Sequence, residues 1–596
     1  MTARFRRSVG GVCGPQGKRF EGTGRPHGFG SLIGSVVASA LLLAIHTTAQ
    51  AQVAPPVNAG SLLEEVERQR PAPAAPRQGP ALNVPPLLEP SAAPTAEFTV
   101  KDFTFTGNTK VKPSVLQAAL ASYLNRPIQF KDLQEAANVV ADTYAERGWL
   151  ARAFIPRQDI TEGTVRIHII EAVYGGSRLE GEFDHASRER VQATVDDQNV
   201  KGEVLSLTDV ERGLLLADDL PGVSVVGSLV AGENTQETDV LINVEDAPWI
   251  TGRVQVDNQG NKSTGENEVS VNTAINGLTG HADQLNVYGL YTEGLSFISA
   301  SYSVPLSYRG LRLGASYSTL GYRIIDEDLA ASEGSGFANT WGLDLSQPLI
   351  RSRNTNVLAK LSYTNKLFDN RAGKVSTSEY TVDVVALALT ATHLDSLGGG
   401  GYTTLTLTPS VGNVDYSLSP AITRNEIAAT TRTEGQYAKL RYGLSRQQNL
   451  PNNFSLYANL RGQFASKNLD SSERFYLGGP YGVRAYPNNE GGGSQGTLFS
   501  FEVRYNVISA LQLAAFYDVG EVLINKFNDY PRAAVLNSGT LQGAGLSVSW
   551  SAPYNVLLNA TWATRIGNNP FANAQGLDSD GSLDKNRFWL NASIGF

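Results

Sequence analysis

The chain ends in the stretch FWLNASIGF, residues 588–596, in which large apolar side chains occupy every second position. Successive side chains of an extended strand point to opposite faces. One face carries Phe588, Leu590, Ala592, Ile594 and Phe596, and the other carries Trp589, Asn591, Ser593 and Gly595. An apolar face toward lipid and a mixed face toward water, with an aromatic residue at the end of the chain, is typical of a strand in a transmembrane β-barrel.

The same alternation recurs upstream as far as Pro248, in short segments separated by Gly, Asn, Asp and Ser. An even number of strands is usual for single-chain bacterial barrels. A large water-soluble β-protein, such as a solenoid, remains the alternative because it shows the same period of two. We expect no helix in this region and sixteen antiparallel strands, which begin near residues 248, 267, 282, 295, 311, 338, 356, 380, 402, 436, 454, 496, 511, 539, 555 and 587.

The connections between the predicted strands alternate in length. QNLPNN (448–453) is a short turn, whereas the loops at 466–495, 523–538 and 566–586 are long. In outer-membrane barrels the short turns face the periplasm and the long loops face outside. We therefore expect the last strand to run back toward the periplasm.

Residues 1–51 have the order of a secretory signal peptide. A basic front precedes the apolar run LIGSVVASALLLAI (32–45), and Ala49-Gln50-Ala51 follows as a cleavage signature. A membrane anchor is the alternative, but the apolar run is short for a bilayer. Cleavage after Ala51 would remove Cys13, the only cysteine, so the mature chain would hold no disulfide. The chain has a formal net charge of −8, which argues against a nucleic-acid partner.

Between the signal peptide and the predicted barrel lie four segments. Residues 52–70 contain the amphipathic stretch SLLEEVERQR (61–70), which predicts a helix with Ser61 as its N-cap; a disordered tail is the alternative. Residues 71–95 form a linker rich in Pro and Ala. Residues 96–173 read as strand, two helices and two strands, and residues 174–247 repeat that order.

The sequence contains no motif typical of an enzyme. It has neither a G-x-S-x-G elbow nor a phosphate-binding loop. The histidines beyond the signal peptide are scattered and lack metal-ligand spacing; they are His168, His185, His281 and His393. We therefore expect no catalytic residues, cofactor or metal, and no use of a nucleotide in the activity.

The loop GGPYGVRAYPNNEGGGSQG (478–496) combines many glycines with one cation, Arg484. In the second strand after this loop, LQLAAFYDVGE (511–521), the alternation points Asp518 into the barrel. An arginine binds a carboxylate through two parallel hydrogen bonds. We expect the loop, 466–495, to fold into the pore and Arg484 to bind Asp518; an ordinary exposed loop arginine is the alternative.

The stretch GGPYGVRAY, with Gly478, Gly479, Val483, Arg484 and Tyr486, resembles the VRGY/F loop motif of the outer-membrane transporters that carry POTRA domains. Ala485 stands where that motif usually has Gly. The stretch Phe516-x-Asp518-x-Gly520 resembles the partner motif of the same superfamily. The two repeated units look like POTRA domains. The whole layout is similar to that of TpsB transporters of two-partner secretion.

This resemblance implies a fold class and a function. The fold is a transmembrane β-barrel of sixteen antiparallel strands (248–596), preceded by two β-α-α-β-β POTRA domains and an N-terminal plug helix. The protein would lie in the outer membrane of a Gram-negative bacterium and export a large haemolysin- or adhesin-like partner exoprotein. Alternatives are an outer-membrane protein insertase of the same superfamily, and a passive porin, for which the periplasmic domains would have no use.

The resemblance also implies partners. The exoprotein would bind the POTRA domains by adding a strand to a sheet edge, for which ARAFIP (151–156) and SVVGSLV (224–230) are both candidates. The sequence does not decide between them, and internal sheet pairing is the alternative for each. Outer-membrane lipids, periplasmic chaperones and the barrel-assembly machinery are the other expected partners.

Overall fold

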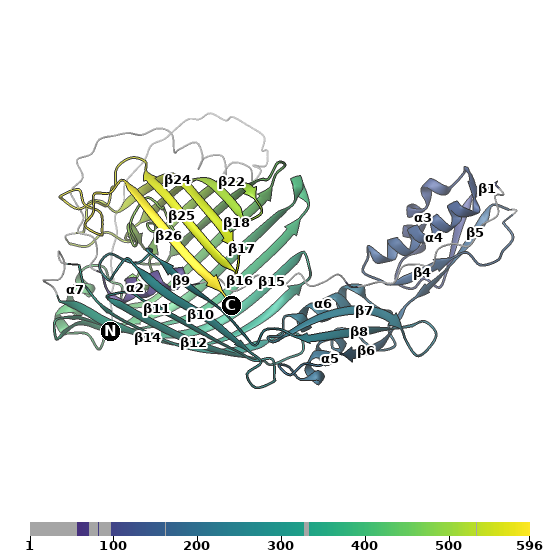
Figure 1. The fold of residues 1–596 in the computed structure, drawn as a ribbon, viewed down its shortest axis with the longest axis horizontal. Helices are drawn as coiled ribbons and strands as arrows, with labels where there is room; N and C mark the ends of the chain where they lie inside the picture. Colours follow the sequence, from purple (N-terminus) through teal and green to yellow (C-terminus); the bar gives the residue numbers. More distant parts are fainter. Residues whose placement is uncertain (1–56, 71–81, 83–96, 161, 327–332, 532) are drawn as a thin grey trace, which may run out of the picture. The chain divides into compact units, whose positions relative to one another are not determined.

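The structure, a computed structural model, describes residues 57–70, 82, 97–160, 162–326, 333–531 and 533–596. The predicted signal peptide and nearly all of the predicted linker lie outside the described residues. Sixteen antiparallel strands close into a barrel, as predicted (Figure 1). They are β9 (Ile250–Asp257), β10 (Glu268–Asn276), β11 (Gln284–Tyr291), β12 (Leu295–Pro305), β13 (Arg312–Arg323), β14 (Gly334–Arg351), β15 (Thr355–Ala372), β16 (Val375–Asp395), β17 (Gly401–Asp415), β18 (Gly435–Asn449), β19 (Phe454–Ala465), β22 (Gln495–Ile508), β23 (Leu511–Leu523), β24 (Ser538–Ala552), β25 (Val556–Arg565) and β26 (Asn586–Gly595).

The barrel closes where its last strand pairs with its first. β26 and β9 pair from Asn591↔Asp257 to Gly595↔Arg253. Beyond that ladder the backbone N–H of Phe596 donates to the carbonyl of Gly252 (3.0 Å), and the N–H of Gly252 donates back (2.9 Å). The C-terminal residue therefore takes part in closing the ring.

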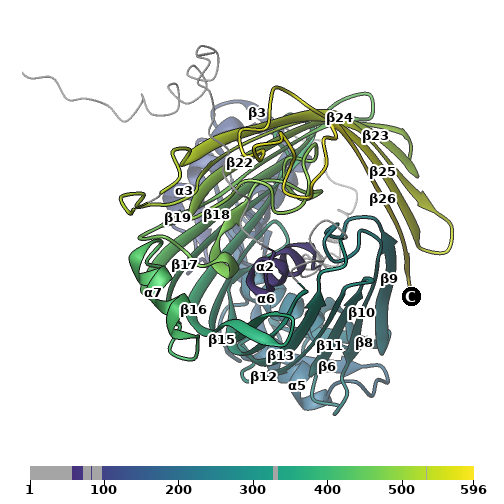
Figure 2. The same ribbon diagram turned by 90° about the vertical axis from the view of Figure 1, so that its left-hand side faces the viewer.

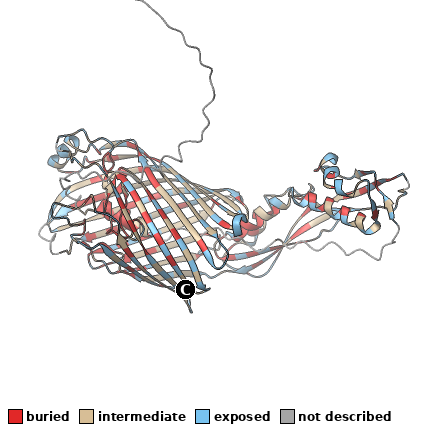
Figure 3. Cartoon of the chain, turned by 90° about the horizontal axis from the view of Figure 1, so that it is seen from above, coloured by how far each residue is buried: buried red, intermediate tan, exposed pale blue. Residues whose placement is uncertain are grey.

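The two faces of the strands differ in burial, as the alternation predicts (Figure 3). On β26, Phe588 (63% exposed), Leu590, Ile594 and Phe596 lie on the outer wall, whereas Trp589 is buried. On β23, Asp518 is fully buried and Tyr517 is exposed. A contiguous belt of exposed apolar side chains is stable only against lipid, so the outer face is the membrane-facing one.

The expectation of no helix after Pro248 is wrong in one place. Helix α7 (Ala421–Ala429) lies in the connection between β17 and β18, and none of its residues is buried. Because an exposed helix needs no apolar stripe, the pattern that identifies helices does not mark it. Its sequence, AITRNEIAA, contains good helix formers, which were the available local signal.

Two small α/β units precede the barrel. The first holds β1 (Glu97–Thr99), β2 (Asp102–Thr106), α3 (Pro113–Ala119), β3 (Pro127–Gln129), α4 (Phe130–Ala145), β4 (Ala151–Phe154) and β5 (Thr164–Glu171). The second holds β6 (Val173–Glu180), α5 (Arg188–Asp196), α6 (Leu207–Asp218), β7 (Val223–Ala231) and β8 (Glu237–Asp246). The sheet orders are β2-β5-β4 and β6-β8-β7, so β4 and β7 are both edge strands of their three-stranded sheets.

Helix α2 (Ala59–Gln69) lies inside the ring of barrel strands (Figure 2). Its N-cap is Asn58 and not Ser61, so that prediction is wrong. The Asn58 side chain accepts from the backbone N–H of Ser61 (3.0 Å), and the Ser61 hydroxyl accepts from the N–H of Asn58 (3.2 Å). Ser61 is therefore the third residue of a reciprocal capping box. Among the described residues, no helix is both long and apolar enough to cross a membrane.

Candidate functional site

The connection between β19 and β22, residues 466–494, folds into the barrel. Its short strands β20 (Phe475–Tyr476) and β21 (Gly492–Gly493) pair with each other, and the N–H groups of Leu477 and Gly478 both donate to the carbonyl of Glu490. At Gly479 the backbone has φ +103°, and a Cβ at Gly482 would lie 1.9 Å from the carbonyl of Leu477. Only glycine fits these two positions, so the glycines allow the backbone to turn sharply in a single defined conformation.

Arg484 lies at the centre of this loop, with its side chain 14% exposed. Its Nε and Nη2 donate to the two carboxylate oxygens of Asp518 on β23 (2.9 and 2.8 Å), and its Nη1 donates to Glu502 on β22 (2.8 Å). We call Arg484, Asp518 and Glu502 the clasp. Burial alone would lower the pKa of Arg484, but hydrogen bonds to and charges of the two carboxylates outweigh it and raise the pKa. The guanidinium is thus permanently charged.

Other residues of the two motifs shape the surroundings of the clasp. The ring centroid of Phe516 lies 3.4 Å from the guanidinium carbon of Arg484. A Cβ at Gly520 would lie 2.6 Å from the side chain of Leu477, so this glycine leaves the room that the loop occupies. Trp589 on β26 donates from its indole N–H to the backbone carbonyl of Arg484 (2.8 Å). The loop is therefore held by β22, β23 and β26 together.

The loop also packs against an apolar part of the inner wall. Val483, Ala485 and Tyr486 are fully buried. They pack with the inward residues Leu498 of β22 and Leu541 of β24. Apolar residues on the inner face of a barrel are stable only where something covers them, and here the cover is the loop.

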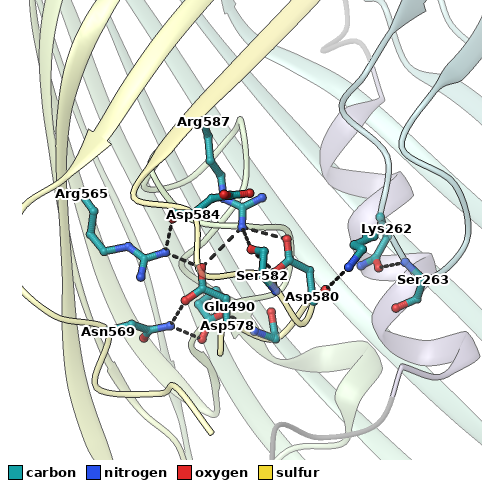
Figure 4. Close-up of polar contacts among 12 residues, drawn as sticks. Lys262, Ser263, Glu490, Arg565, Asn569, Asp578, Asp580, Ser582, Asp584 and Arg587 are labelled. Carbon is teal, nitrogen blue, oxygen red and sulfur yellow. Dashed lines mark hydrogen bonds and ion pairs between the residues drawn. The ribbon is translucent and has the colours of Figure 1, made fainter. Parts of the chain in front are cut away.

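A second polar cluster holds the loop from the side of the connection between β25 and β26, residues 566–585 (Figure 4). Glu490 accepts from the side chain of Asn569 (2.9 Å) and from the backbone N–H of Ser579 (2.7 Å). Asp578 is fully buried between Arg565 and Arg587. The long connection is thus pinned to both adjoining strands and to the loop that carries Arg484.

Helix α2 fills another part of the lumen. Leu62, Leu63 and Val66 are buried against inward aromatic residues of the wall, such as Phe368 and Tyr380. The backbone N–H of Ala59 donates to Asn370 on β15 (2.8 Å). The Ser471 hydroxyl, on the loop that carries Arg484, donates to Asn58 (2.9 Å). The helix therefore contacts the wall and that loop together.

The charged side of α2 is matched by the wall. Glu64 binds Arg441 on β18 (2.8 Å), and Glu67 lies 3.7 Å from Lys366 on β15. Glu65 is buried and accepts from Asn261 (3.2 Å) and Asn488 (2.9 Å). Burial raises the pKa of Glu65 to about 7, against the lowering effects of Arg68 and these amides. The seat of α2 is therefore polar on one side and apolar on the other.

Sequence reasoning missed several of these partners. Glu502 lies on the inner face of β22, where Ser500 pairs with Asp518, so it is the diagonal neighbour of Asp518. The register of β22 and β23 places Glu502 beside Asp518. Trp589 and Asp578 come from segments remote in sequence from Arg484, and no local signal joins them to it. Glu490 lies in the same loop as Arg484, but no local signal indicates its contact with residues 566–585. In the described part of the chain, no cluster of His, Cys, Asp and Glu suits a metal ion.

Comparisons with known proteins show the family and the fold of this chain. The model of a family described as haemolysin secretion/activation protein ShlB/FhaC/HecB matches residues 236–550, more than half of the chain, and the model of a ShlB-type POTRA domain matches residues 98–172. The heme/hemopexin transporter protein HuxB of Haemophilus influenzae (strain 86-028NP) is 27% identical over 94% of this chain and 98% of its own length.

Two further proteins are similar to this chain. The outer membrane transporter CdiB of Dickeya dadantii is 25% identical over 76% of this chain and 81% of its own length. The solved structure of CdiB from Escherichia coli has the same fold, with a TM-score of 0.64 at 20% identity, over 92% of this chain and all of that one.

Proposed function

Because this chain belongs to the family of haemolysin secretion/activation proteins ShlB/FhaC/HecB, we propose that α2 is the movable part of a gated export pore and that the loop at 466–494 is the fixed surface it rests on. The protein is an outer-membrane transporter of two-partner secretion, which moves a partner exoprotein from the periplasm to the cell surface. The family consists of transporters, and the proposed mechanism contains no catalytic step.

In this proposal α2 is the plug of the resting pore. The single observation that carries it is the position of α2 inside the ring of strands, with residues 59–66 all buried. The helix ends at Gln69, and residues 71–95, rich in Pro and Ala, connect it to the first strand of the chain's first α/β unit. A sequence rich in Pro and Ala favours extended conformations, so we expect a linker of this length to let the helix leave the lumen.

The clasp has a different role from the plug. It holds the loop at 466–494 in one register on β22 and β23, so that α2 and the exoprotein meet a defined surface. A buried ion pair fixes geometry more than it adds stability, because the charges lose most of their hydration. We assign the clasp to the arrangement of the pore and not to the stability of the barrel.

The exoprotein enters through the two POTRA units. Its binding by strand addition is supported by the edge positions of β4 and β7, where Phe154 and Val226 expose apolar side chains. Both edges remain candidates. Periplasmic chaperones would keep the exoprotein unfolded, and the barrel-assembly machinery would insert the barrel itself.

The cargo is a large exoprotein of the haemolysin or adhesin type. The relative from Haemophilus influenzae is named a heme/hemopexin transporter, which makes a haem-acquisition exoprotein another candidate for the cargo of this chain. The family match disfavours the two other functions considered, a membrane-protein insertase and a passive porin.

Tethering the helix tests the plug. Asn58 and Ser471 carry short side chains in direct contact (2.9 Å), and the described residues contain no cysteine. In the double variant Asn58→Cys/Ser471→Cys, oxidation is expected to stop secretion of the exoprotein and a reductant is expected to restore it. Secretion is measured by the amount of exoprotein in the medium.

The two single-cysteine variants are the controls, and they are expected to secrete equally with and without oxidant. In lipid bilayers, the oxidised double variant should show fewer openings than the reduced one. Normal secretion through a fully oxidised double variant would refute the plug.

A further inference from the structure

Four cations gather on the inner wall beside α2: Lys366 of β15, Lys439 and Arg441 of β18, and Arg461 of β19. Arg441 pairs across the ladder with Gln463, two residues from Arg461, so the two arginines are neighbours on one face. Glu473 of the loop at 466–494 joins the remaining two, at 3.2 Å from Lys366 and 2.5 Å from Lys439. We call these four residues the wall cations.

The carboxylates that face the wall cations belong to other elements. Glu64 and Glu67 come from α2, and Glu473 comes from the loop. Arg461 donates to the backbone carbonyl of Tyr481, and its Nε, which is buried, has no hydrogen-bond partner among the described residues. When α2 leaves, Glu473 is the one carboxylate of these three that stays with the four cations.

We propose that the wall cations form a binding surface for acidic stretches of the polypeptide in transit, and that α2 occupies this surface at rest through Glu64 and Glu67. The inference rests on the proposed function, since it requires α2 to leave the lumen and the exoprotein to pass through it. The helix shows which chemistry fits: its carboxylates reach Arg441 and Lys366 in the structure.

This assignment has a physical reason. Ammonium and guanidinium groups bind carboxylates by charge and hydrogen bonds, whatever the rest of the sequence. In a water-filled pore such ion pairs are weak, because water has a high dielectric constant and hydrates both partners, so they release readily. Acidic stretches of the exoprotein compete with Glu64 and Glu67 of α2 for the wall cations and so displace the plug. Because each contact is weak, the exoprotein is released again and continues through the pore.

The test unmasks the wall without changing it. In the variant Glu64→Lys/Glu67→Lys, the two lysines of α2 repel Arg441 and Lys366. The helix is expected to leave the lumen, and the pore is expected to open in a lipid bilayer. Oligoglutamate of ten residues is then added from the periplasmic side, and oligolysine and oligoglutamine of equal length serve as comparisons. Oligoglutamate is expected to block the current through the pore, and this block is expected to weaken at high salt. Oligoglutamine is expected to leave the current unchanged.

Removing two of the four wall cations should weaken the block. Adding Lys366→Gln and Arg441→Gln to that background is expected to weaken the block by oligoglutamate at least about tenfold, as two close charge contacts are lost. The matched control adds Lys360→Gln instead. Lys360 lies on the same strand as Lys366 but pairs with Asp344 of the wall (3.3 Å). The carboxylate of Asp344 therefore stays beside Lys360 when α2 leaves.

The outcomes separate this inference from the proposed function. Two results would refute the wall cations as a binding surface and leave the plug unaffected. One is an open pore that oligoglutamate and oligoglutamine block equally; the other is a block by oligoglutamate that the loss of Lys366 and Arg441 does not change. A pore whose conductance does not respond when α2 is repelled overturns the plug, and the inference with it.

Discussion

Arg484 shows how one side chain can define the position of a long loop. Its guanidinium meets two carboxylates on neighbouring strands, and its backbone carbonyl accepts from Trp589. Each contact constrains a different direction, so the loop has little freedom left at this point. Ala485, next to it, points its Cβ toward Gly543, where another Cβ would lie only 2.7 Å away. The alanine is therefore accommodated by a glycine on the facing strand.

Substitution of Arg484 should separate folding of the barrel from secretion. Arg484→Ala leaves Asp518 buried without this cation, whereas Glu502 keeps its ion pair with Arg504 (2.7 Å). Removing one partner of a buried pair costs about 3–5 kcal/mol. The strand ladders do not involve this side chain, so the barrel is expected to insert normally. Secretion is expected to fall roughly tenfold or more, since 1.4 kcal/mol is already a factor of ten. Exoprotein in the medium and barrel in the outer membrane are both measured.

The control for Arg484 is Arg432→Ala. Arg432 is an exposed loop arginine with a long contact to Asp529 (4.0 Å), so its loss is expected to leave secretion unchanged. Reversing the clasp, with Arg484→Asp and Asp518→Arg together, is expected to recover part of the secretion. Full secretion by Arg484→Ala would remove the clasp from the mechanism.

Glu65 gives the seating of α2 a dependence on pH. Burial raises its pKa from the ordinary glutamate value of 4.5 to about 7 in the lumen, where Arg68 and Glu268 are charged groups that interact with it. A carboxyl whose pKa is raised on binding favours the bound state below its free pKa. That preference is lost as pH rises from about 4.5 to about 7. We expect the pore to be more often closed at pH 5 than at pH 8 in lipid bilayers.

Glu65→Gln isolates this effect. Glutamine is neutral at every pH and retains a side-chain carbonyl that accepts from Asn261 and Asn488. The variant is expected to stay closed at pH 8 and to lose most of the dependence between pH 5 and 8. An unchanged pH profile in Glu65→Gln would assign the titration to another group.

At the scale of elements, the connections on one rim of the barrel hold one another. The connection at 566–585 is pinned by Asp578, which lies between Arg565 and Arg587, and it grips Glu490 of the loop at 466–494. Lys262, between β9 and β10, donates to the carbonyl of Asp580 (3.1 Å). A loop that carries function is therefore supported by another loop as well as by strands.

Asp578 is the residue on which this support depends. Asp578→Asn removes the carboxylate that binds Arg565, whose side chain is 7% exposed, and leaves Arg587 with Asp580 (2.8 Å). Removing one partner of a buried pair costs about 3–5 kcal/mol, enough to favour local opening of this connection. On intact cells, protease is expected to cut within residues 566–585 in the variant and not in the unmodified protein.

Asp584→Asn is the matched control within the same connection. Asp584 is exposed and contacts Arg565 through its backbone carbonyl (2.8 Å), so the substitution keeps that hydrogen bond. Equal protease resistance of the Asp578→Asn and unmodified proteins would show that the strands alone hold the connection.

At the scale of the whole molecule, closure of the ring depends on fit at the seam. A Cβ at Gly252 would lie 2.4 Å from the ring of Phe596 and 2.8 Å from the carbonyl of Asn272. Gly252→Ala is therefore expected to destabilise the closed barrel by about 1–3 kcal/mol, the usual range for overpacking. The measurement is the temperature at which the folded, faster-migrating form disappears on a denaturing gel.

Gly443→Ala is the control for the seam. A Cβ there would meet nothing closer than Thr406 at 4.0 Å, so the unfolding temperature is expected to stay the same. If both glycine variants unfolded at the same temperature, the loss would reflect strand flexibility and not the fit of Phe596.

Much of the fold could be predicted because its signals are local. Alternation along each strand predicted the sixteen strands and the face of Asp518 and Trp589. The ends of strands were less accurate: β16 begins at Val375, not near 380, because beyond the bilayer its outer face needs no apolar residue. Helix α7 and the N-cap Asn58 were missed, since neither is marked by an apolar stripe.

The sequence by itself determined the class of fold, the number of strands, the direction of the last strand and the face of each side chain. A shift of one residue would turn every side chain to the wrong face, so the pattern is strongly constrained. The tertiary structure alone decided which lumenal groups meet: Glu502 and Trp589 with Arg484, Glu64 with Arg441, and the apolar seats of α2 and the loop. Alternation specifies a face, but only closure of the ring brings distant strands within contact distance.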